Sequence, residues 1–214
     1  MKKRVAYYGG SFDPPHRGHI AIAHALLKQF DFDEFIFVPA FHAPHKTRKQ
    51  PTSAYDRYAM LCLVTQDEPK MTVSRIEIEA PERPYSVETL GQLTAERSNE
   101  DIFFVMGADS WEEITTWREW ETVLGLTNHI VVTRPGYEIG FDHVTDAIRD
   151  RIVDLRSGRG FENDRGRSIF VSNAVRVDVS ATQIRHKIVT GDASWRDDVP
   201  GEVAKYVEKY QIYS

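Results

Sequence analysis

YYGGSFDPPHRGH, residues 7–19, places two glycines, two prolines and two histidines directly after an apolar run. That run, RVAYY (residues 4–8), predicts a short buried strand that ends at Gly9 and Gly10. A glycine pair lets the backbone approach a ligand closely and present its N–H groups. His16 and His19 stand near the start of a predicted helix, whose positive end points the same way. The stretch therefore predicts a phosphate pocket after the first strand.

Strand-like and helix-like runs alternate along the rest of the chain. Apolar or alternating runs predict strands at residues 34–40, 71–80, 101–107, 129–133 and 168–172. Helical patterns occupy residues 19–30, 86–97 and 180–191, and begin at Ser53 and near Pro200. The apolar positions predicted on helix faces are Ile20, Ala23, Leu26, Leu27, Phe30, Tyr55, Ala59, Leu63, Val203, Tyr206, Val207 and Tyr210. The alternation predicts an α/β fold, a Rossmann-like, doubly wound, mainly parallel sheet with helices on both faces and a small C-terminal helical subregion.

Composition and charge restrict the classes of function. The chain has 214 residues, 41% hydrophobic and 28% charged, which predicts one globular domain, residues 1–214, with about 178–214 packed on the rest. A formal net charge of −5 gives no global positive field, so we expect no nucleic-acid or membrane partner. The single Cys62 cannot form an internal disulfide, and the N-terminal apolar run is too short for a signal peptide. We therefore expect a cytoplasmic protein, with the oligomeric state, including a homo-oligomer, left open.

Two histidine pairs raise metal binding as an alternative. HRGH (residues 16–19) and HAPH (residues 42–45) together offer four imidazoles to a zinc ion. Histidine-only loop clusters without a carboxylate or thiolate are weak zinc signatures, and the nearby Arg17 and Lys46 favour an anion. The glycine patterns of dinucleotide-binding dehydrogenases and of P-loop enzymes are both absent. We therefore expect a phosphate ligand rather than a protein-held metal.

Two motifs at opposite ends of the chain carry a family resemblance. His16, Gly18 and His19 form an H-x-G-H motif, which resembles the signature of a nucleotidyltransferase superfamily. SATQIR (residues 180–185) resembles the C-terminal serine–threonine–arginine motif of that superfamily. Further segments resemble those of bacterial nicotinate mononucleotide adenylyltransferases: PHK (44–46), RPYSVETL (83–90), GADS (107–110), TWREW (116–120) and TRPG (133–136). Ser11 and Ala181 depart from the family pattern, in which threonine and serine are frequent.

The resemblance implies adenylyl transfer from ATP to nicotinate mononucleotide, giving nicotinate adenine dinucleotide and pyrophosphate in NAD biosynthesis. It also implies Mg²⁺ carried by ATP and pyrophosphate, without metal ligands from the protein. The catalytic residues that it implies are His16, His19, Lys46 and Arg185. The residues implied for ATP binding are Gly9, Gly10, Ser11, Phe12, His16, His19, Gly107, Asp109, Arg134, Ser180, Thr182 and Arg185. The residues implied for acceptor binding are Asp13, Lys46, Tyr85, Thr89 and Trp117.

Several of these residues also have an ordinary structural interpretation. Trp120 is expected in the core, whereas the motif match favours a ligand contact for Trp117. Asp109 could be the N-cap of a helix. Tyr85 and Thr89 could be plain helix-start residues.

The sequence leaves the acceptor and two loops open. Nicotinamide mononucleotide and phosphopantetheine are alternative acceptors, although the segments around Tyr85 and Trp117 argue against the second. A non-catalytic nucleotide-binding module is less favoured, because it would not need both histidines and Arg185 together. FHAPHK (residues 41–46) could close over a substrate. The glycine- and arginine-rich loop at 157–167 is expected to be solvated rather than an RNA contact.

Overall fold

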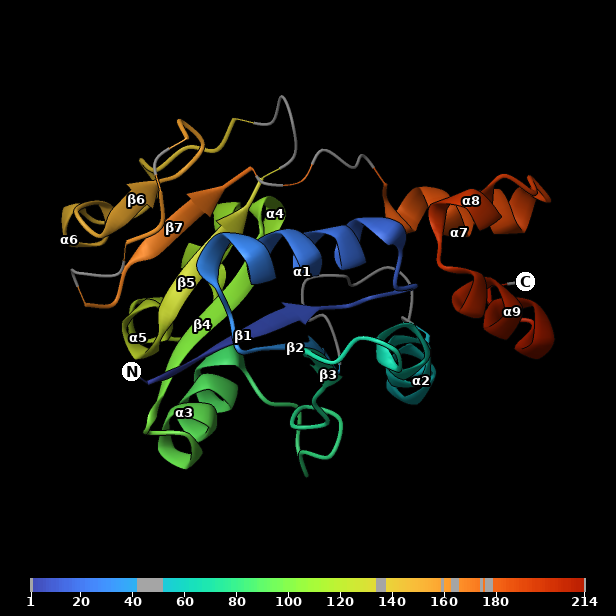
Figure 1. The fold of residues 1–214 in the computed structure, drawn as a ribbon, viewed down its shortest axis with the longest axis horizontal. Coiled ribbons are helices and arrows are strands. Elements are labelled where there is room, and N and C mark those ends of the chain that lie inside the picture. The colour runs from blue at the N-terminus through green and yellow to red at the C-terminus, as the bar shows by residue number, and fades with distance from the viewer. Residues whose placement is uncertain are drawn as a thin grey trace.

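The chain folds around one parallel β-sheet, in a computed structural model that describes residues 2–41, 52–133, 138–158, 160–162, 166–173, 175 and 179–213. In these residues seven strands pair in the order β3-β2-β1-β4-β5-β7-β6, and every pairing is parallel (Figure 1). The strands are β1 (Lys3–Gly10), β2 (Glu34–Pro39), β3 (Met71–Val73), β4 (Glu100–Gly107), β5 (Asn128–Val132), β6 (Ile152–Asp154) and β7 (Ile169–Ser172). The helices are α1 (Arg17–Phe30), α2 (Ala54–Thr65), α3 (Ser86–Glu96), α4 (Ala108–Glu112), η1 (Ile114–Thr116), α5 (Trp120–Leu126), α6 (Asp146–Arg149), α7 (Ala181–Thr190), α8 (Trp195–Asp198) and α9 (Gly201–Tyr210). The predicted α/β fold is confirmed.

Each face of the sheet builds its own apolar core, because successive strand residues point to opposite faces. On one face Tyr7 belongs to a cluster with Leu90 of α3 and Val123 of α5. On the other face Tyr8 belongs to a cluster with Leu26 of α1. Burial on both faces explains why the central strands are apolar throughout, as the run at residues 101–107 predicted.

The C-terminal helices pack on the rest of the protein through a third apolar cluster. Trp195 of α8 and Val203 and Val207 of α9 join Met60 of α2 there, together with Ile184 of α7. Figure 1 shows α2, α7, α8 and α9 gathered beyond the carboxyl end of β1. This packing carries the C-terminal motif to the end of the sheet where the glycine-rich loop lies.

The strand predicted at residues 71–80 is wrong beyond Val73. β3 is an edge strand that pairs with β2 alone in the described residues, so no second partner extends it. The Ile76 N–H donates to Ser74 Oγ at 3.2 Å, which turns the chain away from the sheet. Ile78 is nevertheless buried, with 3% of its surface exposed. The alternating pattern therefore reflects burial through turns rather than a longer strand.

The predicted apolar face of α2 is also wrong in part. Tyr55 is 65% exposed, whereas Met60 and Leu61 are fully buried. The buried face includes Arg57, which is 1% exposed. A charged residue at a core-facing position breaks the hydrophobic periodicity, so the pattern indicated a different face.

Smaller differences concern one extra strand and the ends of two helices. β6 is a short edge strand that was not predicted from the sequence. α1 begins at Arg17 rather than at His19, and Pro200 is the N-cap of α9 rather than a residue of its first turn. On α9, Tyr210 is 56% exposed, in contrast to its predicted place on the apolar face.

Candidate active site

The glycine-rich loop leaves β1 at the carboxyl end of the sheet, next to β4. β1 lies between β2 and β4, so the winding of the chain reverses between β1 and β4. Ligands of open parallel sheets bind outside the carboxyl ends of the strands at such a reversal. Gly9 and Gly10 end β1, and Gly107 ends β4. The structure thus places three predicted ATP residues on adjacent strands at this edge.

Packing leaves no room for a side chain at either glycine of the pair. A Cβ on Gly9 would lie 2.6 Å from Phe104 Cζ, and one on Gly10 would lie 2.9 Å from Phe12 Cζ. Phe12 has a left-handed φ of 49°, which is uncommon for a bulky residue. Its ring meets those of Tyr8 and Phe37 edge-on, with centroids 5.3 and 5.5 Å apart. Aromatic packing against β1 and β2 therefore fixes the shape of the loop at Phe12.

The two histidines of the H-x-G-H motif lie against each other at the start of α1. Their rings are stacked, with centroids 3.6 Å apart and an angle of 20° between planes. The His16 backbone N–H donates to His19 Nδ1 at 3.2 Å. A ring nitrogen that accepts a hydrogen bond carries no proton, so the proton of neutral His19 is on Nε2. Nε2 is therefore the atom of His19 that can donate to a ligand.

The C-terminal motif meets the glycine-rich loop through Arg185. Its Nη1 donates to the backbone oxygen of Asp13 at 2.5 Å, and its Nη2 donates to Thr182 Oγ1 at 3.2 Å. Ser180 is the N-cap residue of α7, so Ser180 and Thr182 stand at the positive end of that helix. The structure brings the two ends of the chain together at one place, as predicted.

Arg57 is a second arginine in this region, and sequence reasoning missed it. Its guanidinium donates to the backbone oxygens of Ser11 and Ala40 at 2.6 Å each and of Thr52 at 3.0 Å. Burial lowers its pKa, and the nearby Asp13 carboxylate opposes that shift. Arg57 therefore ties the loop after β1 to the end of β2 and the start of α2. An isolated arginine within an apolar helix carries no sequence signal for this role.

Tyr213 also reaches the loop, and it too was missed. Its hydroxyl donates to Asp13 Oδ1 at 2.7 Å. The Asp13 side chain is 10% exposed, so its carboxylate is held inside the protein rather than presented to solvent. Asp13 was expected to contact the acceptor, whereas here its oxygens face Tyr213 and Arg185.

The predicted acceptor residues Tyr85 and Thr89 lie at the start of α3. Tyr85 is the N-cap residue and is 46% exposed. Thr89 is 3% exposed, and its hydroxyl donates to Glu77 Oε1 at 3.1 Å. Burial raises the pKa of Glu77 to about 7. The hydrogen bonds from Thr89 and the Phe41 backbone lower this pKa and so partly oppose the shift. Tyr85 is therefore partly accessible, whereas the Thr89 hydroxyl is already bonded to Glu77.

Of the tryptophans at positions 111, 117 and 120, Trp111 is the core residue. It is fully buried, and its indole N–H donates to the Gly140 oxygen at 3.0 Å. Trp117 and Trp120 are both half-buried against the same cluster, so Trp120 is less central than expected. Arg118, next to Trp117, lies 5.0 Å from the ring centre of Tyr85.

Of the remaining predicted residues, the structure describes Asp109 but not Lys46 or Arg134. Asp109 lies in the first turn of α4 and is exposed. The N-cap of α4 is Gly107, so the alternative in which Asp109 is the N-cap is wrong. Lys46 and Arg134 lie outside the described residues, as do the histidines of HAPH and part of the 157–167 loop.

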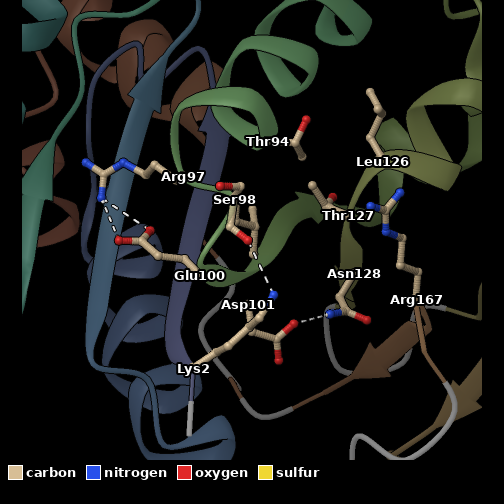
Figure 2. Close-up of a pocket in the computed structure, with 11 residues that line it drawn as sticks. Lys2, Thr94, Arg97, Ser98, Glu100, Asp101, Leu126, Thr127, Asn128 and Arg167 are labelled. Atoms are coloured by element: carbon tan, nitrogen blue, oxygen red, sulfur yellow. Dashed lines mark hydrogen bonds and ion pairs between the residues drawn. The ribbon is translucent and has the colours of Figure 1, made fainter.

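A separate pocket of about 190 Å³ lies at the opposite, amino-terminal edge of the sheet (Figure 2). Its two carboxylates already have partners: Glu100 pairs with Arg97 at 3.2 Å, and Asp101 accepts a hydrogen bond from the Asn128 amide at 3.0 Å. None of its lining residues belongs to the two end motifs. Figure 2 shows these side chains around the starts of β4 and β5. This pocket is therefore distinct from the candidate site.

The described residues contain no group of three or more His, Cys, Asp or Glu side chains that could hold a metal ion. Among the described helices, none has the length and apolar character of a membrane span.

The chain resembles known proteins in both sequence and fold. Residues 7–187 match the model of the cytidylyltransferase-like family. A Streptomyces coelicolor protein named "Probable nicotinate-nucleotide adenylyltransferase" is 34% identical over 205 residues, which cover 96% of this chain and 98% of that protein. A Mycolicibacterium vanbaalenii protein of the same name is 32% identical over 212 residues, covering 99% and 92%. The structure of Plasmodium falciparum nicotinic acid mononucleotide adenylyltransferase complexed with NaAD has a TM-score of 0.73 at 16% identity, covering 99% and 97%, which establishes a shared fold.

Proposed function

The chain belongs to the cytidylyltransferase-like family, and from this premise we propose that it transfers an adenylyl group from ATP to nicotinate mononucleotide. The products are nicotinate adenine dinucleotide and pyrophosphate, a step of NAD biosynthesis. One observation carries the proposal: Arg185 contacts Asp13, 172 positions away, at the carboxyl end of β1. That contact assembles a cationic and hydrogen-bonding cradle from both ends of the chain.

The reaction needs positioning and charge stabilisation rather than an activated nucleophile. A phosphate oxygen of nicotinate mononucleotide attacks the α-phosphorus of ATP, and the bond between that phosphorus and the β-bridging oxygen breaks. Pyrophosphate leaves with the electron pair. Because a phosphate monoester has a second pKa of about 6, the attacking group is already mostly dianionic at neutral pH. The protein's task is to bring two polyanions together and stabilise the charge on the transferred group.

In this proposal the ATP half of the site is built from the two end motifs. His19 donates from Nε2 to the phosphate chain, with His16 stacked against it. Arg185 binds the phosphates with its remaining N–H groups, at the positive end of α7. The other ATP contacts are assigned to Gly9, Gly10, Ser11, Phe12, Gly107, Asp109, Ser180 and Thr182. Lys46 and Arg134 stay predictions.

The acceptor half is built around the start of α3 and Trp117. The exposed ring of Tyr85 and the half-buried Trp117 supply aromatic surface for the pyridine ring. The Thr89 hydroxyl donates to Glu77, so we assign Thr89 a supporting role in the acceptor half. Asp13 acts in this proposal through its contacts with Tyr213 and Arg185.

Mg²⁺ enters this scheme with ATP. In this proposal the ion is bound chiefly by phosphate oxygens and water. Bound there, Mg²⁺ would neutralise charge on the leaving pyrophosphate. A cytoplasmic location stays a prediction that cell fractionation would check.

The test is pyrophosphate release by the purified protein with ATP, Mg²⁺ and one acceptor at a time. Nicotinate mononucleotide is expected to give the highest kcat/KM, above nicotinamide mononucleotide and phosphopantetheine. Higher kcat/KM with either alternative would reassign the acceptor. Calorimetric ATP binding without pyrophosphate release from any acceptor would indicate a nucleotide-binding module instead.

A further inference from the structure

The segment after α9 folds back onto the loop that follows β1. Gln211 and Tyr213 have left-handed φ angles of 53° and 72°, which reverse the direction of the chain. The Tyr213 hydroxyl then donates to Asp13 Oδ1 at 2.7 Å, across 200 positions of sequence. Burial, followed by the charge of Asp13, raises the pKa of Tyr213, so it remains a hydrogen-bond donor at neutral pH.

Asp13 lies between Tyr213 and Arg185. Its second carboxylate oxygen, Oδ2, is 3.9 Å from Arg185 Nη1, which is too far for a hydrogen bond. At hydrogen-bond distance, and within the described residues, Arg185 meets only neutral oxygens: the Asp13 carbonyl and the Thr182 hydroxyl. A closer approach of Oδ2 to Nη1 would convert this loose contact into a charge-assisted pair.

We propose that Tyr213 is a positioning residue that holds the Asp13 carboxylate away from Arg185, so that the guanidinium stays available to the triphosphate of ATP. This inference rests on the proposed function, in which Arg185 binds the ATP phosphates. A carboxylate and a triphosphate compete for the same planar donors of a guanidinium. The hydroxyl of Tyr213 occupies Oδ1 and fixes the rotamer in which that competition is weak.

The first experiment removes the hydroxyl with Tyr213→Phe. Freed of Tyr213, Asp13 pairs with Arg185, and KM for ATP is expected to rise about tenfold, the loss of one hydrogen bond to a charged group. KM for nicotinate mononucleotide is expected to change much less. The matched control is Tyr210→Phe, because Tyr210 is 56% exposed and lies in the same part of the chain. Equal ATP KM values for the two variants would overturn the proposal.

The second experiment separates this mechanism from a merely structural role. In Tyr213→Phe/Asp13→Asn the amide cannot form an ion pair, so KM for ATP should return to within about threefold of the wild type. A double variant that stays as impaired as Tyr213→Phe would overturn the proposal. If Tyr213→Phe does not fold, Asp13→Asn alone is measured by calorimetry. It should bind ATP at least about twofold more tightly than the wild type, since a nearby negative charge is gone, and weaker binding would overturn the proposal.

These outcomes are distinguishable from failure of the proposed function. Turnover of nicotinate mononucleotide by the wild type tests the function. If the wild type binds ATP without turnover, the same variants are compared by their Kd for ATP, which reports on Arg185 independently of the acceptor.

Discussion

The ATP half and the acceptor half of the proposed site hold their arginines in opposite ways. Arg57 and Arg185 donate to backbone carbonyls and a hydroxyl. Arg118, beside the proposed ring site, lies 3.3 Å from a Glu88 oxygen and 3.7 Å from a Glu119 oxygen. Neutral oxygens orient a guanidinium without cancelling its charge, whereas carboxylates cancel much of it. Arg185, with Asp13 Oδ2 3.9 Å away, therefore keeps more of its charge where a polyanion is proposed to bind. Arg118 is compensated more closely where an aromatic ring is proposed.

The largest effect is expected for His19→Ala, which removes a donor from the ATP half. Loss of the Nε2 donor should lower kcat by about 10²- to 10³-fold, as for a lost oxyanion donor, while the fold stays intact. Steady-state kinetics and circular dichroism measure the two properties. His24→Ala is the control, because His24 is on the same helix and pairs with Glu68 on the surface. Near-normal turnover would remove His19 from the mechanism.

Arg57→Met tests how much stability comes from the hydrogen bonds that buried Arg57 donates to backbone oxygens. Several buried carbonyls would lose their donor, so the free energy of unfolding should fall by about 3 kcal/mol. For a chain of this size that corresponds to a Tm lower by roughly 6–12 °C. Thermal unfolding of Arg97→Met provides the contrast. Arg97 pairs with Glu100 near the surface, and its loss should cost less than about 1 kcal/mol. Equal losses would refute the distinction.

Glu77→Gln tests how the stability of the acceptor half depends on pH. Glu77 has a pKa of about 7 in the folded protein against 4.5 as its ordinary value, so the folded state binds its proton more tightly. The folded state then loses stability as pH rises from about 4.5 to 7, and regains it on acidification. The variant cannot ionise, so it should be more stable than the wild type at pH 8 by on the order of 1–3 kcal/mol, with the gain vanishing near pH 4.

Denaturant unfolding at both pH values measures this difference. The control is Glu79→Gln, because Glu79 is exposed and pairs with Arg75. A stability difference between wild type and Glu77→Gln that does not change with pH would contradict the prediction.

The smallest effect is expected for Arg118→Ala. Because glutamates already compensate Arg118, its loss should change stability by no more than about 0.5 kcal/mol and leave KM for ATP within about twofold. Arg75→Ala, at another exposed ion pair, is the matched comparison. A large rise in KM for ATP would show that charge on the acceptor side serves the triphosphate after all, and the contrast between the halves would fail.

Local patterns predicted most of the fold and part of the site. The apolar run before Gly9 and the helical spacing after His16 depend on neighbouring residues, so strand, loop and helix could be predicted there. The same reasoning was wrong for the edge strand β3. The strand predicted at 71–80 ends at Val73, because no second strand extends β3 in the described residues. Pattern alone does not say whether a strand has one neighbour or two.

The sequence by itself determined the order of the longer strands and helices, the glycines that end β1 and the two motifs that mark a nucleotide site. Only the tertiary structure decided that Arg57 is buried and that Tyr213 holds Asp13. Arg57 donates to Ser11 across 46 positions, and Tyr213 reaches Asp13 across 200. The environment of a charge is set by whichever distant segments fold around it, whereas helix and strand periodicity are set by residues a few positions away.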